Sequence, residues 1–136
     1  MAEIPKILVV DDDPDVVDSL TMILEAGGYQ IVTARDGEEA LTKIKVEKPN
    51  LLLLDLLMPR KDGFAVLKDL QFDEKLIPLR KKMHVVVLTS VREEFARRRY
   101  YLETATMELG VDDYLEKPVT PEELLKTVGR YTRATD

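Results

Sequence analysis

The sequence predicts an α/β fold in which a parallel sheet carries helices on both faces, a doubly wound arrangement. Short apolar runs alternate with stretches of helical periodicity along the chain, which is typical of parallel strands joined by helical crossovers. The length of 136 residues fits one domain, which we expect to span residues 1–136. There is no cysteine, so a hydrophobic core must stabilise the fold without disulfides or a zinc ribbon.

The first predicted strand and helix occupy the amino-terminal end. Residues 7–10 (Ile-Leu-Val-Val) form a short β-rich run, as expected of a buried strand. Pro14 suits the first turn of a helix, where its missing N–H would have no intrahelical partner. Apolar residues follow at helical spacing until Gly27-Gly28 ends the helix. Residues 29–33 are predicted to form the second strand.

The middle of the chain repeats this pattern. Asp36 is placed to cap a helix with acidic residues in its first turn, and Pro49 marks its end. The four leucines 51–54 form a predicted central strand, because the space between Pro49 and the next polar residue is too short for a helix. A third helix follows Gly63.

The last part of the chain completes the alternation. A polar connection interrupted by Pro78 leads to a fourth strand at residues 85–88. A long helical stretch from about 93 to 109 follows, and then a short fifth strand at 114–115. Thr120 precedes a proline and two glutamates, a typical start for a final helix.

Composition excludes several classes of function. The net charge of −6 disfavours a protein that binds nucleic acid directly. No uncharged apolar run is long enough to span a membrane. An apolar leader is not expected, because the acidic residues 11–13 come too early in the chain. Since cysteine is also absent, we expect a cytoplasmic protein.

Chemically active side chains follow four of the predicted strands. Because the carboxyl ends of parallel strands share one edge of a sheet, an acidic cluster, hydroxyls and an ammonium should converge there. An isolated acid after a strand is usually a helix cap, as we expect of Asp13, so the joint placement carries the prediction. The residues are Asp11, Asp12 and Asp13 after the first strand, Asp55 after the third, Thr89 and Ser90 after the fourth, and Lys117 after the fifth.

This convergence indicates magnesium-dependent phosphoryl chemistry. Clustered carboxylates repel one another, and Mg²⁺, which prefers carboxylate ligands and keeps open positions for phosphate oxygens, removes that cost. We therefore predict a Mg²⁺ site formed by Asp11, Asp12 and Asp55. A carboxylate can also attack phosphorus to give an acyl phosphate, with Lys117 and the metal neutralising the transferred group. No P-loop motif is present, so nucleotide hydrolysis is not supported.

Four segments resemble the receiver domain of two-component response regulators, in the family's order. They are residues 7–14 (Ile-Leu-Val-Val-Asp-Asp-Asp-Pro), 55–63 (Asp-Leu-Leu-Met-Pro-Arg-Lys-Asp-Gly), 86–90 (Val-Val-Leu-Thr-Ser) and 110–118 (Gly-Val-Asp-Asp-Tyr-Leu-Glu-Lys-Pro). The resemblance implies a flavodoxin-like sheet of five parallel strands in the order 2-1-3-4-5 with five helices. It also implies a role in signalling, since such a domain catalyses only its own phosphorylation and dephosphorylation.

The resemblance implies a role for each acidic position. Asp55 corresponds to the phosphoacceptor, which receives its phosphoryl group from a phosphohistidine on a sensor histidine kinase or a histidine phosphotransfer protein. Asp11 and Asp12 correspond to the pair that holds Mg²⁺, with Asp12 favoured as the direct ligand. The backbone carbonyl of Leu57 corresponds to the family's backbone ligand position.

The resemblance implies roles for the switch residues as well. Thr89 corresponds to the hydroxyl that swings toward the phosphoryl group, and Lys117 to its ion-pair partner, with a cis peptide bond before Pro118. Tyr114 matches the aromatic residue whose rotamer follows Thr89. The region 92–131 would carry the output, through a homodimer or an output domain, although the 90–110 segment is longer than usual.

Two apolar residues predict a long-lived phosphoryl group. In the family, the positions two residues after the phosphoacceptor and after the switch hydroxyl flank the path of the hydrolytic water. Leu57 and Val91 occupy these positions. Neither side chain can orient a water molecule by hydrogen bonding, so we expect slow hydrolysis.

Two other functions remain open from the sequence. The first is a phosphatase of the haloacid dehalogenase type, with residues 11–13 as its Asp-x-Asp and Asp112-Asp113 as its late acidic pair. The chain has little room for the insertions that enclose a substrate in such enzymes. The second is a binding module that has lost phosphorylation. Of the remaining residues, His84 reads as a strand-entry residue, and the cluster 97–101 (Arg-Arg-Arg-Tyr-Tyr) as a solvated helix face or a partner surface.

Overall fold

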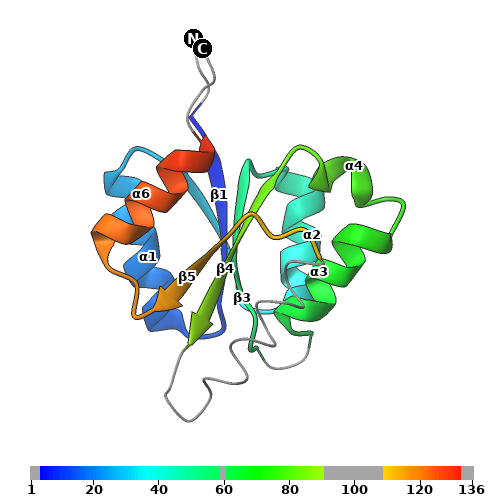
Figure 1. Cartoon of the computed structure of the whole chain (residues 1–136), viewed down its shortest axis with the longest axis horizontal. Coiled ribbons are helices and arrows are strands. Elements are labelled where there is room, and N and C mark those ends of the chain that lie inside the picture. The colour runs from blue at the N-terminus through cyan, green and yellow to red at the C-terminus, as the bar shows by residue number, and fades with distance from the viewer. Residues whose placement is uncertain (1–3, 59–60, 91–108, 133–136) are drawn as a thin grey trace.

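The computed structural model describes residues 4–58, 61–90 and 109–132. Within these ranges, five parallel strands form one sheet in the order β2-β1-β3-β4-β5, with helices on both faces (Figure 1). The strands are β1 (Lys6–Val10), β2 (Gln30–Ala34), β3 (Leu51–Asp55), β4 (His84–Ser90) and β5 (Asp113–Lys117). The helices are α1 (Pro14–Ala26), α2 (Gly37–Glu47), α3 (Gly63–Phe72), α4 (Ile77–Arg80) and α6 (Pro121–Thr132). The predicted fold class and strand order are confirmed.

Two hydrophobic cores lie on the two faces of the central strands. Successive side chains of a strand point to opposite faces, and both faces of β3 are covered, so all four leucines 51–54 are fully buried. Leu52 and Leu54 pack with residues of α2 and α3. Leu51 and Leu53 pack with residues of α1 and α6, which cover the other face (Figure 1). This double coverage explains why the run is apolar without alternation.

The local signals at the helix ends act as expected. The side chain of Asp13 accepts a hydrogen bond from the Asp15 N–H, and that of Asp36 accepts one from the Glu39 N–H, so both residues cap helices. Gly28 has a φ of +93° directly after α1, a conformation that favours glycine. These caps set the points at which the chain leaves the sheet edge and returns to it.

The connection before β4 differs from the prediction. It was expected to be a polar connection interrupted by Pro78, but it contains the short helix α4, with proline in its first turn. Proline is tolerated there because it needs no N–H partner. The predicted helix at 93–109, the cluster 97–101 and Val91 lie outside the described residues. None of the described helices is both long enough and apolar enough to cross a membrane.

Candidate functional site

Three carboxylates meet at the carboxyl edge of the sheet. Asp11 and Asp12 follow β1, and Asp55 is the last residue of β3. Because β1 and β3 are parallel neighbours with Val10 opposite Leu54, their ends lie side by side. One oxygen from each carboxylate lies within 4.8 Å of the others. The structure therefore brings the three acidic residues into one cluster.

Asp55 is held in a buried position. It is only 5% exposed, and its Oδ1 accepts a hydrogen bond of 3.1 Å from the N–H of Leu57. Its Oδ2 lies 3.3 Å from Nζ of Lys117. Burial raises the pKa of Asp55 to about 6, because the loss of solvation and the charge of Asp11 together outweigh the attraction of Lys117. At neutral pH this carboxylate is ionised but more basic than an ordinary aspartate.

Lys117 connects the carboxyl end of β5 to both buried acids. Its Nζ donates to Oδ2 of Asp11 at 2.6 Å and to Oδ2 of Asp55 at 3.3 Å. Burial alone would lower the pKa of Lys117, but the hydrogen bond to Asp11 and the charges of Asp55 and Asp11 outweigh it, and the pKa is raised. The ammonium therefore stays charged. The peptide bond between Lys117 and Pro118 is cis, as expected.

The cluster is suited to a hard divalent cation. Within the part of the chain that the structure describes, it sets three carboxylates against one ammonium, an excess of negative charge that such a cation would neutralise. Asp11 is 1% exposed and accepts a hydrogen bond from the N–H of Asp13, whereas Asp12 is exposed. An exposed carboxylate beside two buried ones gives a site that is open on one side. Oxygen ligands with open positions are what Mg²⁺ prefers, so the residues present fit this ion.

Gly63 brings α3 directly against the strand that carries Asp55. Its N–H donates to the carbonyl of Leu56 at 3.1 Å. A Cβ at this position would lie 2.7 Å from the Cα of Leu56, which is too close for any side chain. The sequence predicts only that a helix follows Gly63. From sequence alone, a glycine that is needed for close backbone packing looks the same as a glycine that is needed for a turn.

Thr89 and Tyr114 lie on the same side of the sheet. Thr89 is near the carboxyl end of β4, and Tyr114 is opposite Val87 in the neighbouring strand β5. Val87 and Tyr114 both pack in the core between the sheet and α2 and α3. Thr89 shares the face of Val87, because alternate residues of a strand point the same way. This placement is compatible with the coupling that the resemblance implies.

Comparison with known proteins decides the family. The sequence of residues 7–129 matches the family model of the response regulator receiver domain. The chain belongs to this family. It is 40% identical over 131 residues to the alkaline phosphatase synthesis transcriptional regulatory protein PhoP of Bacillus subtilis (strain 168), covering 96% of this chain and 50% of that protein. It is 39% identical over 130 residues to response regulator MprA of Mycobacterium avium (strain 104), covering 96% and 52%.

Solved structures agree with the family assignment. A putative response regulator from Chloroflexus aurantiacus J-10-fl superposes with a TM-score of 0.80 at 31% identity, covering 95% of this chain and 98% of that one. Chemotaxis response regulator CheY4 of Vibrio cholerae gives a TM-score of 0.78 at 27% identity, covering 95% and 99%. The expected family, its fold and its place in two-component signalling are confirmed. The receiver domain spans about half the length of the curated relatives it matches.

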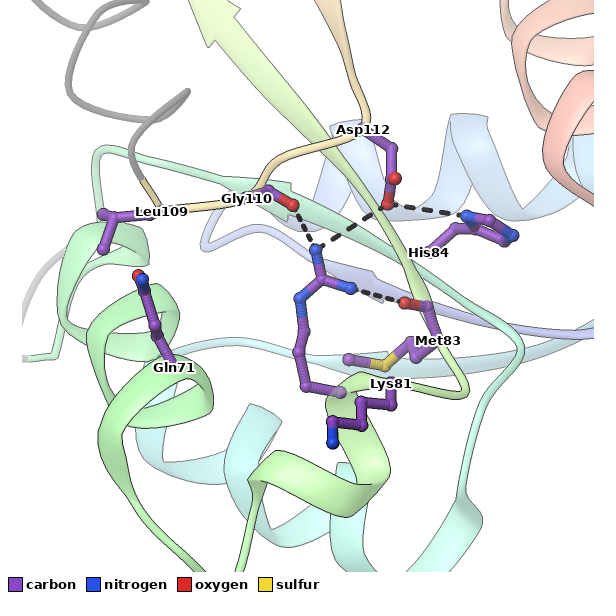
Figure 2. A pocket seen from close by; sticks show the side chains of 8 residues that line it. Gln71, Lys81, Met83, His84, Leu109, Gly110 and Asp112 are labelled. Carbon is purple, nitrogen blue, oxygen red and sulfur yellow. Dashed lines mark hydrogen bonds and ion pairs between the residues drawn. The ribbon is translucent and has the colours of Figure 1, made fainter.

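A cavity of about 430 Å³ lies at the opposite edge of the sheet (Figure 2). The Arg80 guanidinium there donates to the carbonyls of Met83, at 2.6 Å, and Gly110. The same guanidinium lies 3.8 Å from Oδ2 of Asp112, and Nδ1 of His84 lies 3.5 Å from that oxygen. These hydrogen bonds and ion pairs hold α4 and β4 against the segment that leads into β5. His84 is the first residue of β4, as expected of a strand-entry residue.

This arrangement removes the structural basis of the phosphatase alternative. That alternative needs Asp112 and Asp113 beside the acidic residues that follow β1. Asp113 begins β5, whereas Lys117, which contacts Asp11, ends it. Asp112 therefore lies at the amino edge of the sheet, away from the carboxylate cluster of the receiver domain.

Proposed function

We propose that Asp55 accepts a phosphoryl group from a phosphohistidine of a sensor histidine kinase or a histidine phosphotransfer protein. The observation that carries the proposal is the buried carboxylate of Asp55, 3.3 Å from Lys117 and clustered with Asp11 and Asp12. An oxygen of Asp55 forms a bond to phosphorus while the bond from phosphorus to the imidazole nitrogen breaks. The imidazole leaves with the electron pair of that bond and takes up a proton.

The environment of Asp55 favours this step. With a pKa raised to about 6 by burial, its carboxylate is ionised at neutral pH and more nucleophilic than a solvated one. The Lys117 ammonium lies where it would neutralise charge on the oxygens of the transferred group. Because Asp11 holds the same ammonium at 2.6 Å, Lys117 is already oriented before a phosphodonor arrives.

Mg²⁺ is the metal that we propose for the carboxylate cluster. Asp11, Asp12 and Asp55 would hold it with the backbone carbonyl of Leu57. When bound, the ion supplies positive charge to the oxygens of the phosphoryl group. The N–H of Leu57 is fixed by its hydrogen bond to Asp55, which restrains the backbone that carries this carbonyl.

Phosphorylation would then be read through Thr89, Lys117 and Tyr114. Thr89 would hydrogen-bond the phosphoryl group, and Tyr114, which lies on the same face of the sheet, would respond to its movement. The surface expected to change is the region 92–131, of which β5 and α6 belong to the described residues. A homodimer or an output domain would bind there.

Three broader expectations remain proposals. We propose that residues 1–136 form a single receiver domain that catalyses only its own phosphorylation and dephosphorylation. The relatives PhoP, a transcriptional regulatory protein, and MprA, a response regulator, are each about twice as long as the matched region. A cytoplasmic location, with neither nucleic acid nor membrane bound directly by this domain, stays a prediction from composition.

The test is incubation with acetyl phosphate and Mg²⁺, followed by intact-mass measurement. We expect one phosphate adduct on the parent protein and none on Asp55→Asn. Asp112→Asn is the matched control, because it removes a carboxylate at the opposite edge of the sheet, and it should be phosphorylated like the parent. An adduct on Asp55→Asn, or none on the parent, would refute the proposal. Turnover of a generic phosphate ester by the parent would instead favour a phosphatase.

A further inference from the structure

The first residue of α2 is bonded to the loop that follows Asp55. The N–H of Gly37 donates to the carbonyl oxygen of Lys61 at 3.0 Å. The first N–H groups of any helix lack intrahelical acceptors, so the Lys61 carbonyl satisfies one of them. Because Lys61 lies between β3 and α3, this bond ties α2 to the segment that carries the phosphoacceptor and its metal ligands.

The space around Gly37 leaves no room for a side chain. A Cβ on Gly37 would lie 2.8 Å from Cγ of Lys61 and 2.8 Å from Cγ2 of Val66, and closer still to the Lys61 carbonyl oxygen. Its backbone is not left-handed, since the positive-φ glycines among the described residues are Gly28 and Gly110. Glycine also costs a helix about 1 kcal/mol relative to alanine. Neither backbone conformation nor helix propensity therefore explains a glycine here.

The loop that Gly37 contacts is restrained on its other sides as well. The Leu57 N–H is bonded to Asp55, and the Leu56 carbonyl to the Gly63 N–H. The Lys61 side chain forms an ion pair with Asp69 of α3. Lys61 is two residues before Gly63, whose N–H is bonded to the carbonyl of Leu56, the neighbour of Leu57. A displacement of the Lys61 carbonyl therefore bears on the backbone at Leu57 through this bond.

We propose that Gly37 is a positioning residue for the metal site: through the carbonyl of Lys61, it sets the place of the Leu57 backbone carbonyl. The inference rests on the proposed function, because it concerns the same cluster and the same ion. Gly37 is 18 positions before Asp55 in the sequence, and its N–H is bonded to the carbonyl of Lys61. It acts by the space that it leaves for Lys61.

The test is Mg²⁺ binding by unphosphorylated Gly37→Ala, measured by calorimetric titration with Mg²⁺ alone. Changes in groups that orient metal ligands weaken binding by about 10- to 100-fold, and Gly37 is one step further away. We therefore expect the dissociation constant to rise by about threefold to tenfold. In the metal-free protein, the amide NMR signal of Leu57 should also shift. Gly129→Ala is the matched control, because the nearest atom to a Cβ there is 3.9 Å away, and it should change neither value.

A double variant separates positioning from core packing. Val66→Ala removes the methyl groups that a new Cβ would meet but leaves the Lys61 carbonyl in the way. We expect Gly37→Ala/Val66→Ala to keep the weakened Mg²⁺ affinity of the single variant. Recovery of the parent affinity would show that the effect comes from packing against Val66, and would overturn the inference.

A second pair of variants covers the case in which Gly37→Ala does not fold. Lys61→Gly loosens the backbone around the carbonyl without adding an atom, whereas Lys61→Ala removes the same ion pair and keeps the backbone stiff. We expect weaker Mg²⁺ binding in Lys61→Gly than in Lys61→Ala, and equal affinities would overturn the inference.

A parent protein that binds no Mg²⁺ would refute the proposed metal site itself. A parent that binds Mg²⁺ as tightly as Gly37→Ala does would refute only the role of Gly37.

Discussion

The two edges of the sheet both carry charged clusters, but the clusters differ in charge balance and burial. At the amino edge, Asp112 faces Arg80 and His84, and Asp113 faces Arg130 at 2.7 Å, so each acid has a basic partner. At the carboxyl edge, the Lys117 ammonium forms ion pairs with Asp11 and Asp55, so within the described ranges two of the three carboxylates of the cluster share one cation. A balanced cluster is complete as a structural link, whereas an unbalanced one remains able to bind a cation.

Burial makes this difference larger. Asp11 and Asp55 are 1% and 5% exposed, so their charges are poorly screened. The side chain of Asp112 is 29% exposed, and that of Arg130 is 52% exposed. Exposed ion pairs contribute little to stability. The comparison teaches that charge density alone does not mark the site. The site is marked by charge that is both buried and unbalanced.

Removing the cation from each edge gives the largest expected contrast. Lys117→Met takes away the group that neutralises the phosphoryl oxygens, and the loss of one such donor typically slows a reaction by about 10²- to 10³-fold. We expect the rate of phosphorylation by acetyl phosphate to fall by about this factor. Arg80→Met should leave the rate unchanged and lower the free energy of unfolding by about 1–3 kcal/mol, because two hydrogen bonds from a charged group are lost. Equal rates in the two variants would contradict the comparison.

The buried charge of Asp55 should make the stability of the protein depend on pH. In the folded protein the pKa of Asp55 is raised to about 6, and in an unfolded chain it is about 4. Above pH 6, therefore, the folded state carries the cost of a buried charge. As the pH falls from 6 to 4 the folded state binds a proton that the unfolded state does not, and the cost disappears.

Asp55→Asn removes this cost and should stabilise the protein. After allowance for solvent screening, we expect a gain of about 1–2 kcal/mol above pH 6 in the absence of Mg²⁺, vanishing near pH 4. Asp112→Asn should bring no such gain, since it removes no buried charge and only weakens contacts with Arg80 and His84. Urea unfolding at a series of pH values measures both effects. A loss of stability in Asp55→Asn at neutral pH would show that the ion pair with Lys117 outweighs burial.

The sequence allowed the sheet to be predicted because each strand is a run of apolar residues between clear turn signals. The leucines 51–54 and the cap at Asp13 are examples in which the local signal and the tertiary structure agree. The helix α4 was missed because Ile77–Arg80 has no apolar periodicity. Arg80, at its carboxyl end, is bonded to Met83 and Gly110, and such tertiary contacts do not appear in a local pattern.

The site was predictable in its members but not in its internal contacts. Parallel strand ends converge by topology, so Asp11, Asp55 and Lys117 could be grouped before any distance was known. Lys117 lies closer to Asp11 than to Asp55, and a difference of this kind arises in tertiary packing, which no local sequence pattern contains. The contact between Gly37 and Lys61 could not be predicted, because a glycine at the start of a helix is also a common turn signal.

Metal addition should stabilise one edge alone. An ion that binds only the folded state at ten times its dissociation constant adds about 1.4 kcal/mol to the free energy of unfolding. We expect Mg²⁺ at that concentration to raise the melting temperature of the parent accordingly and EDTA to reverse the change. Asp12→Ala should lose most of the response, whereas Asp15→Ala, which alters an exposed acid of α1, should keep it. An equal response in both would place the ion outside the cluster.

The smallest expected effect concerns the lifetime of the acyl phosphate. The Leu57 side chain is 58% exposed beside Asp55, and it offers an approaching water molecule no hydrogen-bonding group. In Leu57→Asn, the amide can hold and orient that water, so we expect the phosphoryl group to decay several times faster. Loss of the phosphate adduct over time, followed by intact mass, measures the rate. Phe72→Asn is the control, since it removes another exposed apolar side chain at the far end of α3 and should leave decay unchanged. An unchanged rate in Leu57→Asn would mean that the attacking water does not pass this side chain.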